Sequence, residues 1–328
     1  MNFTIGTASA GPGEMSHGKL HVCTTMGGFD VFIPVTILNG VEEGPKLVVS
    51  GSVHGNEIYG SVAISKLMNK IDPKKLKGTV IFVPVTNISA FQNPSGGREG
   101  TRHSIWDLQI LNRVDPKKDG SVTEQVWYAF REIVAMGDYH VDIHSGAIPY
   151  VYYTGYHKPG PDDDPELFKT LKDLCLAFGI NQVWRSFPKS WGVKMPDKKA
   201  KEHILVELGG GNLFIADKHV GEIMTGVTNM MKYLGMLEGK IEPQCEVVKI
   251  YDGDWDVYSK HGGFCDRLVD YGDEVKEGQE VFLIYDPFTG KELERVRAPV
   301  DGVVLNTGTL FKYSIKASMC FGKLVEEV

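Results

Sequence analysis

Short apolar runs, rich in β-branched residues and bounded by turn residues, recur along the first two thirds of the chain and predict buried strands. The five runs are Lys46–Ser50, Thr79–Val85, Tyr139–Ile143, Tyr150–Tyr153 and Ile204–Leu208. Helical stretches between and after them lie near Ile58–Met68, Val122–Met136, Glu166–Phe178 and His219–Leu237. Strands that alternate with helices indicate an α/β fold with a mixed, mostly parallel sheet flanked by helices.

The pattern changes after about Gln244. From Glu246 to Val328 the chain reads as short alternating strands separated by turns. We therefore expect two domains, an α/β domain at residues 1–244 and an all-β domain at residues 245–328. Parallel sheets bind ligands at the carboxyl ends of their strands, so the residues that follow the strands of the first domain are candidates for a site.

The composition is that of an ordinary globular protein, with 42% hydrophobic and 23% charged residues. The net charge of −7 gives no sign of a nucleic-acid partner. No apolar run approaches the ~18–20 residues of a membrane-spanning helix, and residues 1–20 lack the apolar core of a signal peptide. Five scattered cysteines are typical of reduced thiols. Together these features predict a cytoplasmic protein that has no membrane partner.

A histidine and a glutamate three residues apart follow the first of these strands. His54 and Glu57 lie in the segment Ser-Gly-Ser-Val-His-Gly-Asn-Glu, whose two glycines permit a sharp turn before the next helix. Zinc binds imidazole nitrogen and carboxylate oxygen, and a catalytic zinc site uses three protein ligands and a water. His144, at the end of another predicted strand, is the candidate third ligand.

Taken alone, this spacing leaves a structural interpretation open, because a histidine at a strand end is often a polar cap or a satisfied core residue. Asp142 faces the same side of its strand as His144 and could orient the ligating histidines. His140 shares that face, and we interpret it as a core or supporting residue. The residues themselves predict a divalent metal site, at which cobalt or manganese could replace zinc.

Six motifs, in order along the chain, carry a resemblance to a known family. They are GSVHGNE (51–57), NP (93–94), TR (101–102), LNR (111–113), DIHSG (142–146) and VELGGG (206–211). With these motifs the chain resembles the succinylglutamate desuccinylase and aspartoacylase family, a branch of the zinc-carboxypeptidase-like fold. The ten residues from Arg102 to Asn112 resemble the longer-insert branch, which includes ectoine-pathway N-acetyl-diaminobutyrate deacetylases.

The resemblance implies that the three candidate ligands hold one Zn²⁺ per subunit and that the protein is a homo-oligomer. It implies Glu207 as general base and Arg102 as the group that stabilises the oxyanion. Asn112 and Arg113 would grip a carboxylate of a small N-acyl substrate. From the residues alone, Glu207 could equally be an ion-paired structural glutamate, and an Asn-Arg pair is more often a surface turn.

Residues 271–305 resemble a biotinyl/lipoyl-type barrel-sandwich domain, chiefly in the turns GDEVKEGQ and APVDG. Lys291 stands seven residues before the Ala-Pro of the second turn, where carrier domains are modified. The methionines that flank a biotinylated lysine are absent, so we interpret Lys291 as an ordinary lysine at a hairpin tip.

Three functions are compatible with these observations. The first is a zinc-dependent amidohydrolase that removes the acyl group from a small N-acyl amino acid or N-acyl amine. The second is a zinc carboxypeptidase or amidase that acts on a peptide, with the same metal and glutamate in a more open cleft. The third is a non-catalytic carrier or scaffold built on the β domain. The full set of residue types at the catalytic positions argues against the third. The first is our preferred interpretation, and an assay of N-acyl amino acids against peptides separates it from the second.

Overall fold

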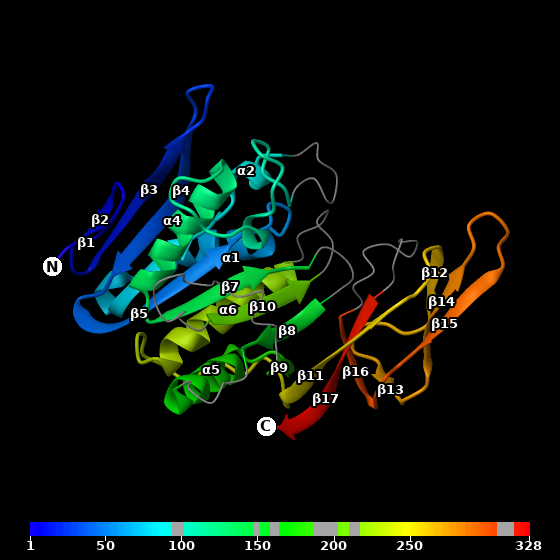
Figure 1. Ribbon diagram of the computed structural model, residues 1–328. Coiled ribbons are helices and arrows are strands. Elements are labelled where there is room, and N and C mark those ends of the chain that lie inside the picture. Colours follow the sequence, from blue (N-terminus) through cyan, green and yellow to red (C-terminus); the bar gives the residue numbers. More distant parts are fainter. Residues whose placement is uncertain (94–101, 147–150, 158–163, 186–202, 210–216, 307–317) are drawn as a thin grey trace.

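The computed structural model describes residues 1–93, 102–146, 151–157, 164–185, 203–209, 217–306 and 318–328. Within these residues, twelve strands form one mixed sheet that runs through the protein (Figure 1). In spatial order they are β13 (Glu274–Val275), β16 (Gly302–Asn306), β17 (Ser318–Glu327), β11 (Lys249–Tyr258), β9 (Gln182–Trp184), β8 (Val151–Gly155), β10 (His203–Gly209), β7 (Tyr139–His144), β5 (Glu42–Gly51), β6 (Lys77–Val83), β4 (Asp30–Asn39) and β3 (Glu14–Thr24).

The sheet contains two groups of parallel strands that meet at one antiparallel pair, and its outer strands pair antiparallel. Strands β10, β7, β5 and β6 run parallel, as do β8, β9 and β11. The remaining neighbours pair antiparallel. The prediction of a mixed, mostly parallel sheet fits the first domain, where four of the seven pairings from β9 to β3 are parallel and the outer strands β4 and β3 pair antiparallel. Residues 25–29 join β3 to β4, and strands joined by so short a connection must run antiparallel.

Helices cover both faces of the central strands. Because side chains alternate along a strand, Leu47 and Val49 of β5 pack in one core while Val48 packs in another. Helices α1 (Tyr59–Met68), α5 (Pro165–Phe178) and α6 (Asp217–Tyr233) contribute to the first core, and α4 (Val122–Met136) contributes to the second. The remaining short elements are β1 (Phe3–Ile5), β2 (Ala8–Ala10), α2 (Ile88–Phe91), η1 (Pro73–Lys75) and η2 (Leu111–Arg113).

The predicted elements of the first domain are present, with their ends shifted by a few residues. Each predicted strand overlaps an observed one, although Tyr150 lies outside the described residues. The last helix ends at Tyr233, four residues earlier than predicted. Helix α4 begins and ends as predicted, and its start is fixed by a reciprocal pair of hydrogen bonds between Ser121 and Glu124.

All described secondary structure after residue 244 is β, as predicted. A three-stranded sheet of β12 (Phe264–Arg267), β14 (Glu280–Tyr285) and β15 (Glu292–Arg297) shares a core with β13, β16 and β17. Strand β11 pairs with β9, so the central sheet continues into this region (Figure 1). Lys291 is exposed in the β14–β15 connection, which confirms its place in a hairpin. The domain boundary at residue 244 stays a prediction.

No helix in the described ranges combines the length and apolar character needed to cross a membrane.

Candidate metal centre and active site

The segment after β5 folds into a tight turn that brings His54 and Glu57 to the same side. The backbone N–H of Glu57 donates to the carbonyl of His54 at 3.1 Å, and Ser52 adopts a left-handed conformation with φ of 50°. At Gly55 a Cβ atom would lie 2.2 Å from the carbonyl carbon of Ala90. Only glycine fits such a close approach of two backbones, so this residue lets the turn pack against α2.

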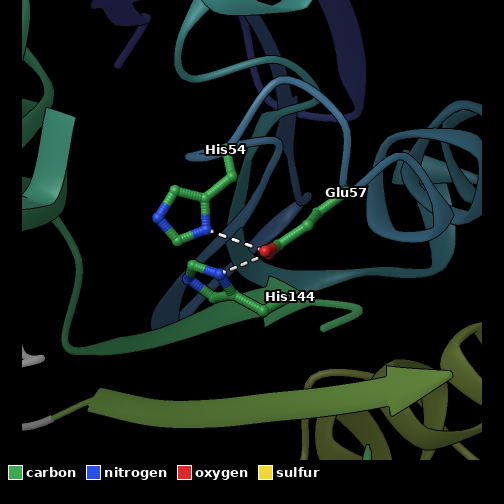
Figure 2. Close-up of side chains that lie close together, drawn as sticks. All are labelled: His54, Glu57 and His144. Atoms are coloured by element: carbon green, nitrogen blue, oxygen red, sulfur yellow. Dashed lines mark hydrogen bonds and ion pairs between the residues drawn. The ribbon is translucent and has the colours of Figure 1, made fainter. Parts of the chain in front are cut away.

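The third candidate ligand, His144, ends strand β7, which lies beside β5. His54 Nδ1 lies 2.9 Å from Glu57 Oε1, and His144 Nδ1 lies 2.7 Å from Glu57 Oε2 (Figure 2). One possible ligand atom from each residue falls within 4.8 Å of the other two, and all three side chains are buried. The structure thus brings together the three residues that the sequence nominates as ligands.

The pKa values of the three residues in this cluster are shifted from their ordinary values. Burial by itself raises the pKa of Glu57, but the positive charge and hydrogen bonds of His54 and His144 hold it well below its ordinary range. Burial lowers the pKa of His144, yet the carboxylates of Asp142 and Glu57 outweigh burial and raise it well above its ordinary range. For His54 burial prevails, and its pKa is lowered. The cluster is built to hold positive charge against Glu57.

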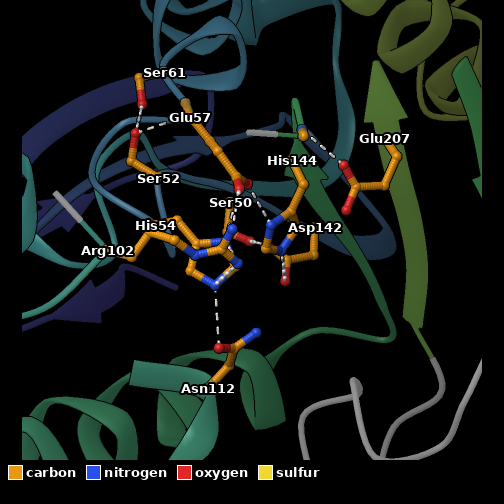
Figure 3. A network of polar contacts seen from close by, with 11 residues as sticks. Ser50, Ser52, His54, Glu57, Ser61, Arg102, Asn112, Asp142, His144 and Glu207 are labelled. Atoms are coloured by element: carbon orange, nitrogen blue, oxygen red, sulfur yellow. Dashed lines mark hydrogen bonds and ion pairs between the residues drawn. The ribbon is translucent and has the colours of Figure 1, made fainter. Parts of the chain in front are cut away.

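The Nε2 atoms of His54 and His144, on the far side of each ring from Glu57, face oxygen atoms. His54 Nε2 lies 3.2 Å from Asn112 Oδ1, and His144 Nε2 lies 3.1 Å from Asp142 Oδ2 (Figure 3). A metal ion that takes the place of the Nδ1 protons facing Glu57 would leave one proton on each Nε2, donated to these oxygen atoms. Two neutral imidazoles and one carboxylate form a donor set that suits zinc and leaves a coordination position open. The residues present therefore fit a divalent metal ion.

The guanidinium of Arg102 lies against the same histidine. Its Nη2 is 3.1 Å from His54 Nε2 and 3.3 Å from His54 Nδ1, and its Nη1 is 3.8 Å from Glu57 Oε1. Its side chain is 18% exposed, so one side of this fixed positive charge is open to solvent. A neutral His54 carries one proton, so its Nε2 either accepts from Arg102 or donates to Asn112. A metal on Nδ1 selects the second arrangement.

Glu207 lies on β10, directly opposite His144 on β7. Neighbouring residues in register point to the same face of a sheet, so the two side chains share one face. Glu207 Oε2 accepts a hydrogen bond from the backbone N–H of Gly146 at 2.9 Å (Figure 3). Glu207 could be a structural residue only if it formed an ion pair, and among the described residues it forms none. Burial, partly offset by His144, raises the pKa of Glu207 to about 7.

The two residues that are predicted to bind the substrate, Asn112 and Arg113, lie in different surroundings. Asn112 in η2 directs its side-chain oxygen to His54, whereas Arg113 is exposed. In the part of the chain that the structure describes, the Arg113 side chain contacts none of the cluster. Two further polar residues extend the cluster: Ser50 donates to Asp142, and His140 is bonded to Ser50. The spacing of the motifs gave no signal for Ser50.

Comparison with known proteins gives a consistent picture. The model of the succinylglutamate desuccinylase/aspartoacylase catalytic domain matches residues 43–234. An N-alpha-acetyl-L-2,4-diaminobutyric acid deacetylase of Halomonas elongata is 30% identical over 286 residues, which cover 84% of this chain and 80% of the relative. A succinylglutamate desuccinylase structure from Silicibacter sp. TM1040 has a TM-score of 0.77 at 25% identity, covering 95% of each chain. The product-bound ectoine utilization protein EutE (DoeB) of Ruegeria pomeroyi shares the fold, with a TM-score of 0.77 at 24% identity and 95% coverage of each chain.

Proposed function

The chain belongs to the succinylglutamate desuccinylase/aspartoacylase family, and from this we propose that it is a zinc-dependent hydrolase of small N-acyl substrates. In this proposal it cleaves the amide bond of an N-acyl amino acid or N-acyl amine with water. The observation that carries the proposal is the convergence of two buried imidazoles and a carboxylate, with Glu207 on the adjacent strand. A metal site and a carboxylate of raised pKa on one face of a sheet are the elements of metal-assisted hydrolysis.

Each residue has a distinct role in the proposed mechanism. When bound by His54, Glu57 and His144, a zinc ion supplies Lewis acidity and lowers the pKa of a coordinated water from ~15.7 to about 7. Glu207 takes the proton from the attacking water and passes it to the departing nitrogen. The positive charge of Arg102, held beside His54, stabilises the oxygen that becomes negative as water adds to the carbonyl.

The relatives and Arg113 support a proposal for the substrate class. One relative is, by name, an N-alpha-acetyl-L-2,4-diaminobutyric acid deacetylase, so N-acetylated diamino acids are the first candidates. Arg113 carries a planar pair of donors that matches a carboxylate, and in this structure it is exposed. We propose that Arg113 binds the substrate carboxylate, with the Asn112 amide group beside it.

The experiment that tests this function is a substrate panel. Purified protein, loaded with zinc, is assayed for release of free amine from N-acetyl amino acids, N-succinyl amino acids, mono-acetylated diamino acids and short peptides. We expect turnover of at least one N-acyl amino acid and its loss on treatment with a chelator. Efficient cleavage of peptides without turnover of any N-acyl amino acid would sink the proposal and favour a peptidase.

The pH dependence of activity should reflect the protonation of the Glu207 carboxylate. A general base must be deprotonated, so activity is present above its pKa and lost as pH falls through it. The pKa of Glu207 is raised to about 7, and a nearby dication favours the carboxylate and lowers this value. We therefore expect an acid limb in kcat/KM with an apparent pKa at or below about 7. The residual activity of Glu207→Gln should lack this limb, and its persistence there would assign the limb to another group.

Replacing Arg113 by alanine should weaken substrate binding more than it slows the chemical step. A hydrogen bond to a charged group contributes ~1.5–3 kcal/mol, so we expect KM to rise roughly 10- to 100-fold with a smaller change in kcat. Steady-state kinetics on the best substrate from the panel provide the measurement. Lys118→Ala, which removes an exposed cation from the same segment, is the control. An unchanged KM in Arg113→Ala means that the carboxylate is held elsewhere.

A further inference from the structure

A row of polar side chains leads from the metal centre into the interior of the sheet. Ser50 on β5 stands in register with Asp142 on β7, and His140 and His144 lie two residues to either side of Asp142. All four therefore point to the same face of the sheet. Ser50 and His140 are 0% exposed, in a region where most neighbouring side chains are apolar. Buried polar groups are costly unless they are hydrogen-bonded, so the pattern of their bonds is informative.

The direction of each hydrogen bond in this row can be deduced. The Ser50 hydroxyl lies 2.7 Å from Asp142 Oδ1 (Figure 3). The same hydroxyl lies 2.9 Å from His140 Nε2. An ionised carboxylate only accepts, so the single hydroxyl proton goes to Asp142. The Ser50 oxygen must then accept from His140, which places a proton on His140 Nε2. The other carboxylate oxygen, Oδ2, accepts from His144 Nε2 at 3.1 Å.

The surroundings of His140 fix this arrangement. Its Nδ1 is buried and, within the described residues, has no hydrogen-bond partner. Its ring packs edge to face on Phe130 of α4, with 5.7 Å between centroids, and lies 5.7 Å from the ring of His203. Burial among these rings lowers the pKa of His140 to about 4 despite the nearby Asp142. A neutral imidazole has one proton, and among the described residues the one hydrogen bond of His140 is through Nε2 to Ser50.

We propose that Ser50 and His140 are positioning residues of the metal centre, acting through Asp142 on the orientation of His144. His140 orients the Ser50 hydroxyl, and Ser50 holds Asp142 Oδ1. Asp142 Oδ2 then fixes the His144 ring so that its Nδ1 faces Glu57. This inference rests on the proposed metal site and adds two residues that touch neither the metal nor the substrate.

A purely structural role for the same residues makes a different prediction. If Ser50 and His140 only satisfy buried polar groups, their loss lowers thermal stability without changing the affinity of the folded protein for metal. If they position His144, metal affinity falls as well, by the ~10–100-fold that is typical when an outer partner of a ligating histidine is removed. Metal affinity therefore separates the two roles, and it can be read without any substrate.

The test uses Ser50→Ala, His140→Met and His140→Gln in the full-length protein. Methionine has a volume close to that of histidine but no donor, whereas the glutamine amide can still donate to Ser50. Thr79→Val is the matched control, because its buried hydroxyl donates to Asn39 on another part of the same sheet. Zinc and cobalt affinities are measured by chelator competition, the visible absorption of bound cobalt reports ligand geometry, and melting curves report stability.

We expect Ser50→Ala and His140→Met to bind both metals ~10- to 100-fold more weakly with an altered cobalt spectrum. His140→Gln and Thr79→Val should stay close to wild type. Wild-type affinity in the first two variants, or an equal loss in Thr79→Val, overturns the inference. If Ser50→Ala does not fold, the contrast between His140→Met and His140→Gln decides. A wild-type protein that binds neither metal removes the proposed function itself, which is a distinguishable outcome.

Discussion

Replacing Glu207 by glutamine will leave metal bound and remove nearly all turnover. The side chain keeps its size and its place opposite His144, and the amide oxygen can still accept from Gly146. An amide cannot take a proton from the attacking water, and loss of a general base lowers rates by ~10²–10⁴-fold. Metal content by elemental analysis and kcat on the best N-acyl substrate are the two measurements.

The matched control for Glu207→Gln is Glu222→Gln. Glu222 is also partly buried, but it lies on α6, on the opposite side of the sheet, where it binds Tyr152 and His219. That variant should turn over substrate within a few-fold of wild type. Full activity in Glu207→Gln would remove Glu207 from the role of base and leave the alternative of a structural glutamate.

Replacing Glu57 by glutamine should have the opposite effect on the metal. Glu57 carries the single negative charge among the three candidate ligands, and its two oxygens face the Nδ1 atoms of both histidines. Glutamine removes that charge and turns one of the two oxygens into an NH₂ group, which cannot bind a metal. We expect metal affinity to fall by more than the ~10–100-fold caused by loss of an outer partner, with turnover falling in parallel.

The two Glu→Gln variants thus make the same chemical change at two positions of the candidate site. Chelator competition should find metal affinity lost in Glu57→Gln and retained in Glu207→Gln. If Glu57→Gln binds zinc as tightly as wild type, the metal lies elsewhere and the proposed ligand set is wrong.

The strands that the sequence predicts are those whose apolar runs pack in the central sheet. Strand β3 escapes prediction because it alternates exposed and half-buried residues at the edge of the sheet and has no continuous apolar run. Strand β4 contains Pro34, which lacks an N–H and argues against a central strand. At Pro34 the strand pairs only with β3, because its pairing with β6 begins at Thr36. In both strands, pairing with neighbouring strands in the fold determines the conformation more than the local sequence does.

In the candidate site, too, residues that are close in sequence could be predicted, whereas contacts between residues far apart in sequence could not. His54 and Glu57 could be nominated because they share one short turn, and His144 because it ends a predicted strand. The contact between Asn112 and His54 joins residues 58 positions apart, and no spacing rule encodes it. Ser50 reads as one more residue of an apolar strand, because its partner Asp142 is 92 positions away. The register between β5 and β7, which only the fold supplies, places Ser50 beside Asp142 and supports the role proposed for it.

The central claim is that amide hydrolysis depends on one metal ion held by His54, Glu57 and His144. The most direct test is a titration of metal-depleted protein with zinc, with bound metal and turnover of an N-acyl amino acid measured on the same samples. We expect no turnover without metal and a linear rise that stops at one zinc ion per chain, with no recovery in Glu57→Gln. Undiminished turnover in the metal-depleted protein, or full recovery in Glu57→Gln, would contradict this claim.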